Sequence, residues 1–198
     1  MREYTIMKVA GQPDWCSVPA LDIDCLLWTE AVPVTAAARI CYDDQALHVQ
    51  LSAKEPNIRA ENTQPLQQPC EDSCLEFFFC PDPGDSRYFN IELNPNGLIY
   101  LGFGSGMHDL VRMYPEDQPI VPHAQRTQDG WQITYAVPFA FIRRFFPDFQ
   151  PVSGGTIRAN CFKCGDLTVQ PHYLSWNPVA SETPQFHRPQ DFGLMRFA

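Results

Sequence analysis

Residues 72–103 read DSCLEFFFCPDPGDSRYFNIELNPNGLIYLGF, and this stretch predicts three consecutive β-strands. Its first part is rich in aromatic and branched residues, which suit a pleated sheet. The PDPGD run at 81–85 ends the first strand, because proline has no N–H for the ladder and glycine accepts positive φ. The NPNG run at 94–97 is a tight-turn signature between the second strand and the third. The predicted strands span 74–80, 87–93 and 98–103.

Side chains alternate between the two faces of this predicted meander, because successive residues of a strand point in opposite directions. One face is apolar and takes Leu75, Phe77, Phe79, Phe89, Ile91 and Leu93. The opposite face carries Glu76, Asn90 and Glu92. A sugar-binding sheet needs such a polar face, but so does an ordinary antiparallel sheet with one side in water. The pattern alone favours the ordinary half-solvated sheet.

Further strands are predicted before and after the meander. They span 4–9, 36–42, 46–54, 120–126, 131–137, 156–164 and 193–197. In the third of these, Leu47, Val49 and Leu51 alternate with polar residues, which is the period of a strand with one buried face. One helix is predicted at 138–146, where a proline takes the permitted first position and apolar residues follow helical spacing. Irregular segments or long loops are predicted at 13–28, 55–71, 104–119 and 165–192.

The composition fits a single β-rich domain. The chain has 198 residues, of which 44% are hydrophobic, so it can build a sizeable core. Nineteen prolines argue against long helices, whereas 14 Phe, 7 Tyr and 4 Trp favour strands. About ten short strands with one short helix predict an all-β fold, an antiparallel, jelly-roll-like β-sandwich. No linker interrupts the chain, so we expect one domain over residues 1–198.

The formal net charge of −9 bears on the partners. Nucleic-acid binding usually needs a basic patch, and the longest basic run here is Arg143-Arg144. An anionic membrane surface would repel the chain, and no segment approaches the roughly 20 apolar residues of a membrane helix. We therefore expect neither nucleic acid nor a membrane as partner. The N-terminus lacks the apolar core of a signal peptide, so we expect a cytoplasmic location if this is the native start.

Eight cysteines raise the questions of disulfides and metals. A chain of this length needs no disulfide staples, and a free cysteine in a strand acts as a small buried hydrophobe, so we expect reduced thiols. The CxxC pair Cys161 and Cys164, together with Cys70 and Cys74, leaves a four-thiolate zinc site as an alternative.

Calcium is the second metal to consider. Asp43, Asp44, Asp82 and Asp85 lie in predicted turns, where carboxylates could bind calcium together with backbone oxygens. Such residues also favour turns without any metal. The metal ligands are therefore left unassigned by the sequence.

Several runs that occur in a fixed order carry a resemblance to a known family. They are DSCLEFFF, YFNIELNPNG, WQITYAVPF, RANCFKCGD, PHYLSWNP and FHRPQDFGLMRF. Together they resemble the family 9 carbohydrate-binding modules and related sugar-binding domains of bacterial glycan-degrading systems, from about residue 36 to the C-terminus. The resemblance implies a β-sandwich that takes part in carbohydrate catabolism by binding sugars without cleaving them. It implies no required cofactor, although structural calcium is common in the family.

The resemblance also implies site residues. Glu76 matches the glutamate of the Asp-Ser-x-x-Glu strand, Asn90 and Glu92 fall at polar sugar-contacting positions, and Trp176 matches a tryptophan in a late loop. The residues themselves add two neighbours on the 156–164 strand, because one face of that strand carries an arginine and an asparagine. The predicted ligand-binding set is Glu76, Asn90, Glu92, Arg158, Asn160 and Trp176, with no catalytic residue.

The chain departs from the family at one point. Members that clamp sugar between aromatic rings have an aromatic residue shortly before the Asp-Ser-x-x-Glu motif, but residues 67–71 here read QQPCE. The clamp is therefore absent, incomplete, or rebuilt from Trp28, Tyr100 or Tyr173.

We expect a carbohydrate partner, either a mono- or oligosaccharide or the end of a glycan. Aromatic rings cover the apolar face of a pyranose, and carboxylates, amides and arginine satisfy its hydroxyl groups. Two alternatives remain. One is an accessory β-sandwich that has lost sugar binding, with a buried arginine–glutamate pair on its polar side. The other is a glycoside hydrolase using Glu76 and Glu92, which would require carboxyl groups roughly 5 to 10 Å apart across a cleft.

Overall fold

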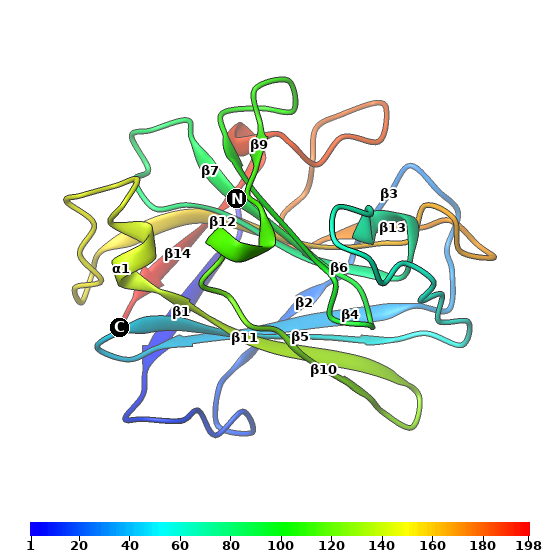
Figure 1. The fold of residues 1–198 in the computed structure, drawn as a ribbon, viewed down its shortest axis with the longest axis horizontal. Helices are drawn as coiled ribbons and strands as arrows, with labels where there is room; N and C mark the ends of the chain where they lie inside the picture. The colour runs from blue at the N-terminus through cyan, green and yellow to red at the C-terminus, as the bar shows by residue number, and fades with distance from the viewer.

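The computed structural model describes the backbone of residues 1–198 and every side chain except that of Pro115. Fourteen strands form the fold (Figure 1). They are β1 (Glu3–Lys8), β2 (Ala20–Ile23), β3 (Cys25–Leu27), β4 (Thr35–Tyr42), β5 (Ala46–Lys54), β6 (Cys74–Cys80), β7 (Tyr88–Leu93), β8 (Ile99–Gly104), β9 (Val111–Arg112), β10 (His123–Arg126), β11 (Gly130–Pro138), β12 (Thr156–Cys164), β13 (Tyr173–Ser175) and β14 (Gly193–Phe197). The helical elements are α1 (Phe139–Ile142) and three 3-10 turns, η1 (Pro69–Glu71), η2 (Pro115–Asp117) and η3 (Pro189–Asp191).

The strands form a two-layered β-sandwich. One layer has the order β10-β11-β5-β4, with β2 beside β4, and the other has the order β14-β12-β6-β7-β8-β9. In the second layer β13 also pairs with β12, and β3 pairs with β13. Strand β1 joins the layers, because its first part pairs with β14 and its last two residues pair with β4. Both pairings of β1 are parallel, whereas the other pairings are antiparallel. The predicted antiparallel β-sandwich is confirmed, with β1 as its parallel exception.

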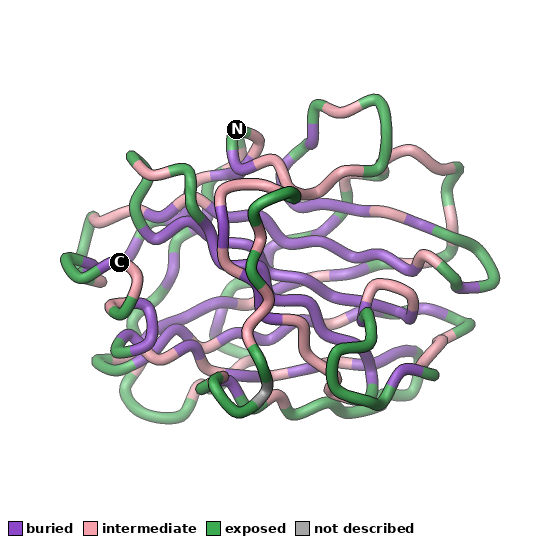
Figure 2. The backbone as a smooth tube through the Cα atoms, turned by 45° about the horizontal axis from the view of Figure 1, so that its top comes forward, coloured by how far each residue is buried: buried purple, intermediate pink, exposed green. Residues whose placement is uncertain are grey.

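The main core lies between the layers (Figure 2). The apolar face predicted for the meander points into it, and the Phe77 and Phe79 rings stack there with centroids 5.0 Å apart. Leu47, Val49 and Leu51 of β5 meet them from the other layer. Each such side chain contributes about 1.5–3 kcal/mol when fully buried, so the period-2 pattern determines which face of each strand is inside.

The opposite face of the meander is also covered, which overturns the half-solvated interpretation. Every residue of β6 and β7 is buried, including the polar ones. A second apolar cluster, built around Phe78, Tyr88, Phe162 and Phe192, covers part of this outer face. The cover comes from segments that the sequence predicts as irregular, and strand periodicity cannot reveal a lid formed by such segments.

Other differences concern short elements. The irregular segment 13–28 contains β2 and β3, and the loops 104–119 and 165–192 contain β9 and β13. These strands are two to four residues long, so their pairing partners, more than their own sequence, make them strands. The predicted helix is shorter than expected, because α1 ends at Ile142. Of the four amides that follow, two bond four residues back and two bond three residues back, and Pro147 then follows.

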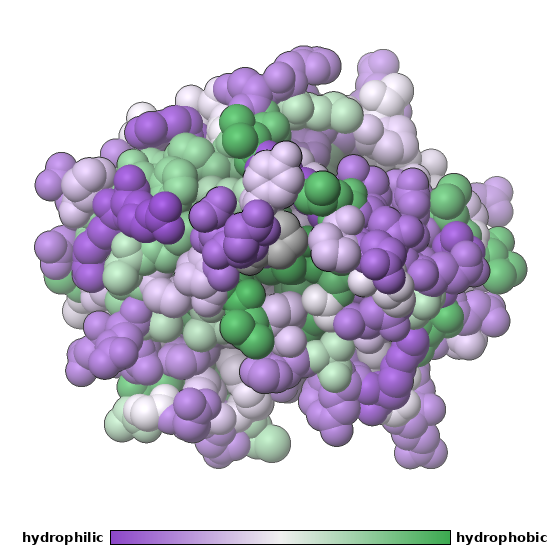
Figure 3. Space-filling model, in the orientation of Figure 1, coloured by the Kyte–Doolittle hydropathy of each residue, from purple (hydrophilic) through white to green (hydrophobic). Residues whose placement is uncertain are grey.

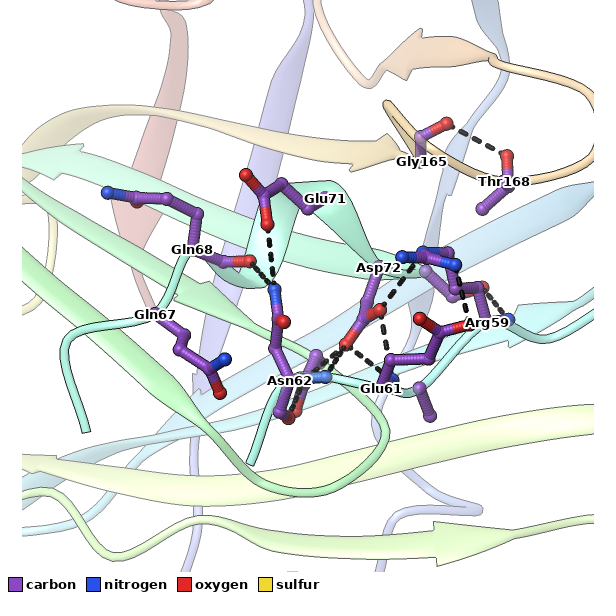
Figure 4. A network of polar contacts seen from close by, with 12 residues as sticks. Arg59, Glu61, Asn62, Gln67, Gln68, Glu71, Asp72, Gly165 and Thr168 are labelled. Atoms are coloured by element: carbon purple, nitrogen blue, oxygen red, sulfur yellow. Dashed lines mark hydrogen bonds and ion pairs between the residues drawn. The ribbon is translucent and has the colours of Figure 1, made fainter. Parts of the chain in front are cut away.

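The Asp-Ser pair before β6 anchors the long loop 55–71, which the sequence predicts correctly as a loop (Figure 4). The Asp72 carboxylate is fully buried and accepts hydrogen bonds from the Glu61 and Asn62 amides at 2.8–3.0 Å. It also accepts one from Asn94 Nδ2 at 2.9 Å, and Arg59 Nε lies 3.4 Å away. Charge-assisted bonds of this kind are the stronger ones, so Asp72 holds the loop against the start of β6.

A buried ion pair lies beneath the same strand. Lys163 is fully buried on the core side of β12, and its Nζ lies 3.3 Å from Glu55 Oε2. Glu55 Oε1 accepts a hydrogen bond from Trp131 Nε1 at 2.6 Å, and Ser73 Oγ donates to Oε2 at 2.9 Å. The pair therefore connects β12 to the loop after β5 and to the second layer.

On the face drawn in Figure 3, apolar side chains occur in small groups between polar ones. Within the described residues, no helix has the length and apolar character that crossing a membrane requires.

Candidate functional site

A pocket of about 220 Å³ lies over the outer face of β6, β7 and β12. It is lined by Trp28, Cys70, Glu76, Glu92, Met107, Cys164, Asp166, Tyr173, Pro184, Gln185, Phe186 and His187. A larger hollow, of about 400 Å³, lies beside Phe145 and Phe146, but its carboxylates are exposed or half-buried. Glu76 and Glu92 are only 2% and 7% exposed. Buried charged groups need a reason, so we regard the smaller pocket as the candidate site.

One wall of this pocket is aromatic. The Trp28 ring lies 5.7 Å from that of Tyr173 in an edge-on arrangement and 5.5 Å from that of Phe186, measured between centroids. Phe186 in turn stacks on Phe162 of β12 at 4.2 Å. Trp28, Tyr173 and Phe186 come from three separate segments, and each keeps part of its surface exposed. Together they form an apolar platform of the type that packs on the C–H groups of a ligand.

Trp28 occupies a strained position. Its φ is 54°, in the left-handed region where a residue with a side chain costs roughly 1–2 kcal/mol. It directly follows β3, whose pairing with β13 brings it to the pocket. Its indole Nε1 donates a hydrogen bond to the Ser181 carbonyl oxygen at 2.7 Å. Strain of this kind clusters at functional sites, and the surrounding bonds hold the ring in place.

The opposite part of the pocket is acidic. Glu76 and Glu92 are direct cross-strand partners on β6 and β7, and Asp166 follows β12. Burial raises the pKa of Glu92 to about 7, and it raises the pKa of Glu76 well above its ordinary value, with the neighbouring Glu92 adding to the rise. Burial also raises the pKa of Asp166. Because the pKa of Glu92 lies at about 7, its carboxyl can both donate and accept hydrogen bonds near neutrality.

The fold and the pocket can be compared with known proteins. The model of carbohydrate-binding family 9 matches residues 14–197. This chain belongs to carbohydrate-binding family 9. No curated protein matches it in sequence.

Solved structures share the fold of this family 9 chain. A protein of Bacteroides uniformis that is thought to bind carbohydrate has a TM-score of 0.86 at 24% identity, over 100% of this chain and 99% of that one. A family 9 module of Caldicellulosiruptor kristjanssonii in complex with cellotriose has a TM-score of 0.73 at 12% identity, over 99% and 93%. The same kind of module in complex with glucose has a TM-score of 0.73 at 12% identity, over 100% and 96%.

The polar residues predicted on β6 and β7 gather at the pocket of the family 9 chain. Glu76 and Glu92 line it. Asn90 is fully buried next to them, and its Nδ2 donates a hydrogen bond to Glu92 Oε1 at 3.0 Å. Asn90 therefore supports a pocket carboxyl and is itself not among the described lining residues.

Arg158 and Asn160 share this outer face, as predicted, but lie away from the pocket. Asn160 is the cross-strand partner of Phe78. Its Nδ2 donates a hydrogen bond to the Asn177 carbonyl oxygen at 2.9 Å, and its Oδ1 accepts one from the Asn177 amide at 2.8 Å. Arg158 lies further along β12, opposite Cys80, with Nη2 3.5 Å from the Asp85 carbonyl oxygen. Asn160 and Arg158 therefore bond to the segments that cover the sheet.

Trp176 lies in the main core. It is 3% exposed, and its ring packs so closely against Gly193 that a Cβ there would come within 2.5 Å of it. Of the clamp candidates, Trp28 and Tyr173 line the pocket. The ring of Tyr100 lies instead under the Arg112 guanidinium, with Arg112 Cζ 4.4 Å from the ring centroid.

The sequence misses several lining residues. Phe186 lies in the long segment 165–192, and Asp166 lies just after β12. His187 of the same segment, which the sequence does offer as a possible ligand contact, also lines the pocket. His187 Nδ1 is 2.8 Å from the Tyr88 hydroxyl, and burial lowers its pKa to about 4, so it is neutral near pH 7. A segment without periodicity offers no signal for which of its side chains face inward.

The cysteines that the sequence suggests as zinc ligands are separated by the fold. All eight cysteines are free thiols. Cys161 points into the main core while Cys164 lines the pocket on the other face, so the four-thiolate zinc set is not assembled. A three-residue spacing in a continuous strand places two side chains on opposite faces.

The turn carboxylates already have partners within the chain. Asp43 Oδ1 accepts hydrogen bonds from the Gln45 and Ala46 amides at 2.7 and 2.9 Å. Asp85 is held by the Arg87 guanidinium at 2.5 Å. This donor arrangement is that of structured turns and does not fit a calcium cage, so structural calcium stays a prediction drawn from the family alone.

Proposed function

We propose that this family 9 chain binds a neutral sugar ring in the pocket and does not cleave it. The observation that carries the proposal is the arrangement of a buried carboxyl pair, Glu76 and Glu92, beside the aromatic platform of Trp28, Tyr173 and Phe186. A pyranose has one apolar C–H face and a rim of hydroxyl groups. The platform suits the first, and the carboxyls supply hydrogen bonds to the second.

The size of the pocket favours one sugar unit. Its volume of about 220 Å³ is below the roughly 300–1,000 Å³ of pockets that enclose drug-sized ligands. We therefore expect the pocket to take a monosaccharide or the terminal unit of a glycan, with further units outside it. Structural relatives of the chain were solved with glucose and with cellotriose, so these sugars are the first ligands to test.

The charges of the pocket argue for a neutral ligand. The described lining residues include three carboxyl groups and neither lysine nor arginine. An anionic sugar such as a uronic acid would place its carboxylate among carboxyls without a cation to balance it. We expect glucuronate to bind more weakly than glucose.

The binding experiment is a calorimetric titration of the protein with glucose, cellobiose and cellotriose. Glu92→Gln keeps the shape of the side chain but removes its charge and its proton exchange. We expect it to weaken binding by about 10-fold or more, since a hydrogen bond to a charged group contributes roughly 1.5–3 kcal/mol. Glu3→Gln, on the exposed surface of β1, is the matched control and should bind like the parent. Equal affinity of the Glu92 and Glu3 variants would contradict the assignment of the pocket.

Absence of catalysis is the second part of the proposal. Glu76 and Glu92 project from adjacent strands on one side of the pocket, whereas a glycosidase pair flanks the bond that it breaks. Membership of a family of non-catalytic binding modules supports the same view. We expect no aglycone release from aryl glycosides by the parent protein. Release that disappears in Glu76→Gln would overturn this part and leave the binding part intact.

A further inference from the structure

Three side chains beside the pocket combine two thiols and a carboxyl. Cys74 and Cys164 are direct cross-strand partners on β6 and β12, and Glu76 lies two residues along β6 on the same face. The Cys74 Sγ, the Cys164 Sγ and a Glu76 carboxylate oxygen all lie within 4.8 Å of one another. The Cys164 thiol donates a hydrogen bond to Glu76 Oε1 at 3.0 Å. All three residues are buried on central strands, so their positions are fixed by the sheet.

We propose that Cys74, Glu76 and Cys164 form a binding site for a thiophilic divalent cation of the Zn²⁺ type. This site goes beyond sugar binding and needs no sugar to be occupied. It differs from the four-thiolate site considered from the sequence, because Cys161 lies on the other face of β12 and a carboxylate takes part instead.

The geometry suits this ion. Zn²⁺ binds thiolate sulfur at about 2.3 Å in a tetrahedron, so its ligand atoms lie about 3.5–3.8 Å apart. Ligand atoms within 4.8 Å of one another can reach that spacing by small rotations of their side chains. Two thiolates with one carboxylate select a softer cation over calcium or magnesium, which prefer oxygen ligands alone.

The fourth position is open. Cys164 and Glu76 line the pocket, and so does Cys70, whose thiol could complete the tetrahedron. If Cys70 does not bind the metal, the fourth coordination position faces the pocket and takes a water molecule, as in zinc sites that keep one position open.

The proton balance is simple. Metal binding breaks the S–H bonds of Cys74 and Cys164, two metal–sulfur bonds form, and two protons pass to solvent. The carboxyl releases a third proton if it holds one. No oxidant or reductant takes part.

The nearest buried ammonium does not substitute for a metal here. Lys163 lies between Phe162 and Cys164 in sequence but points to the other side of β12. Its Nζ contacts Glu55 Oε2, His172 Nε2 and the Cys164 carbonyl oxygen, so these groups already engage it. The cluster can therefore gain a positive charge from a bound cation.

The test uses the full chain, reduced and stripped of metal by a chelator, without sugar. It is titrated with Cd²⁺, and the thiolate-to-metal charge-transfer absorbance is recorded, followed by competition with Zn²⁺. We expect one equivalent per chain with an absorbance typical of two or three thiolates. Cys164→Ser and Cys74→Ser should each weaken binding by at least about 100-fold, the upper end of what loss of a mere outer-shell partner costs.

Two variants serve as controls. The first is Cys80→Ser, because Cys80 lies on the same face of β6 as Cys74. The second is Cys161→Ser, because Cys161 lies on the same strand as Cys164 but on the opposite face. Both should keep the parent affinity. Glu76→Gln should weaken binding while it keeps the charge-transfer band, which gives a readout even if a cysteine variant does not fold. A parent protein without the band, or a band equally reduced in the control variants, would overturn the site.

Discussion

Replacing Trp28 by alanine is expected to weaken sugar binding by about 30- to 1,000-fold. A tryptophan that a ligand covers at the centre of a binding site contributes about 2–4 kcal/mol, and each 1.4 kcal/mol is a factor of ten in affinity. Trp28 contacts Tyr173 and Phe186 and is the largest ring of the pocket wall. The change would remove the central part of the platform, so affinity falls even though the carboxyls remain.

The control for this prediction is Trp15→Ala. Trp15 is half-buried like Trp28, but it lines a different hollow together with His48 and Pro119. Its loss should leave sugar affinity unchanged.

A second variant separates stacking from folding. Trp28→Phe keeps an aromatic face but loses the hydrogen bond from the indole to Ser181, so its affinity should lie between those of the parent and Trp28→Ala. Calorimetry gives the affinities, and thermal unfolding shows that each variant is folded. If Trp28→Ala binds sugar as tightly as Trp15→Ala, the aromatic wall is not the sugar platform.

The role of Trp28 also marks the limit of what the sequence predicts. Residue spacing within 72–103 predicts both ends of β6, at residues 74 and 80, and assigns Phe77 and Glu76 to opposite faces. This succeeds because side-chain direction in a strand depends only on the parity of the residue number. The same rule explains why Cys161 and Cys164 separate onto two faces.

Tertiary contacts determine which loop residues reach the pocket, and the parity of the residue number does not encode them. Trp28 and Trp176 both lie in or beside segments without periodicity, and only the pairing of β3 with β13 takes one to the pocket and the other to the core. Phe186 reaches the site by stacking on Phe162, a contact between residues 24 positions apart in sequence. Such contacts follow from how long loops fold over the sheet, and no local pattern encodes them.

Lys163→Met is expected to lower the free energy of unfolding by about 3–5 kcal/mol, the usual cost of removing one partner from a buried ion pair. The Lys163 ammonium lies 3.3 Å from Glu55 Oε2 and 2.8 Å from His172 Nε2, and both Lys163 and Glu55 are almost fully buried. The His172 Nδ1 lies 2.8 Å from the Gln170 carbonyl oxygen, so Nδ1 carries the proton and Nε2 accepts from the ammonium. Burial, together with the charge of Lys163, lowers the pKa of His172, which keeps the ring neutral for this role.

The expected loss arises mainly from the carboxylate left behind, and a double variant tests this directly. Glu55→Gln removes the negative charge but keeps an acceptor for Trp131 Nε1, which bonds Glu55 Oε1 at 2.6 Å in the parent. Adding it to Lys163→Met should therefore recover part of the lost stability, although each change alone is destabilising. Lys54→Met is the matched control, because Lys54 pairs with Asp129 at 2.8 Å on the open surface, where solvent screens the pair and little stability depends on it. Urea unfolding of the four proteins and the parent measures the coupling, and additive losses in the double variant would mean that Glu55 and Lys163 act independently.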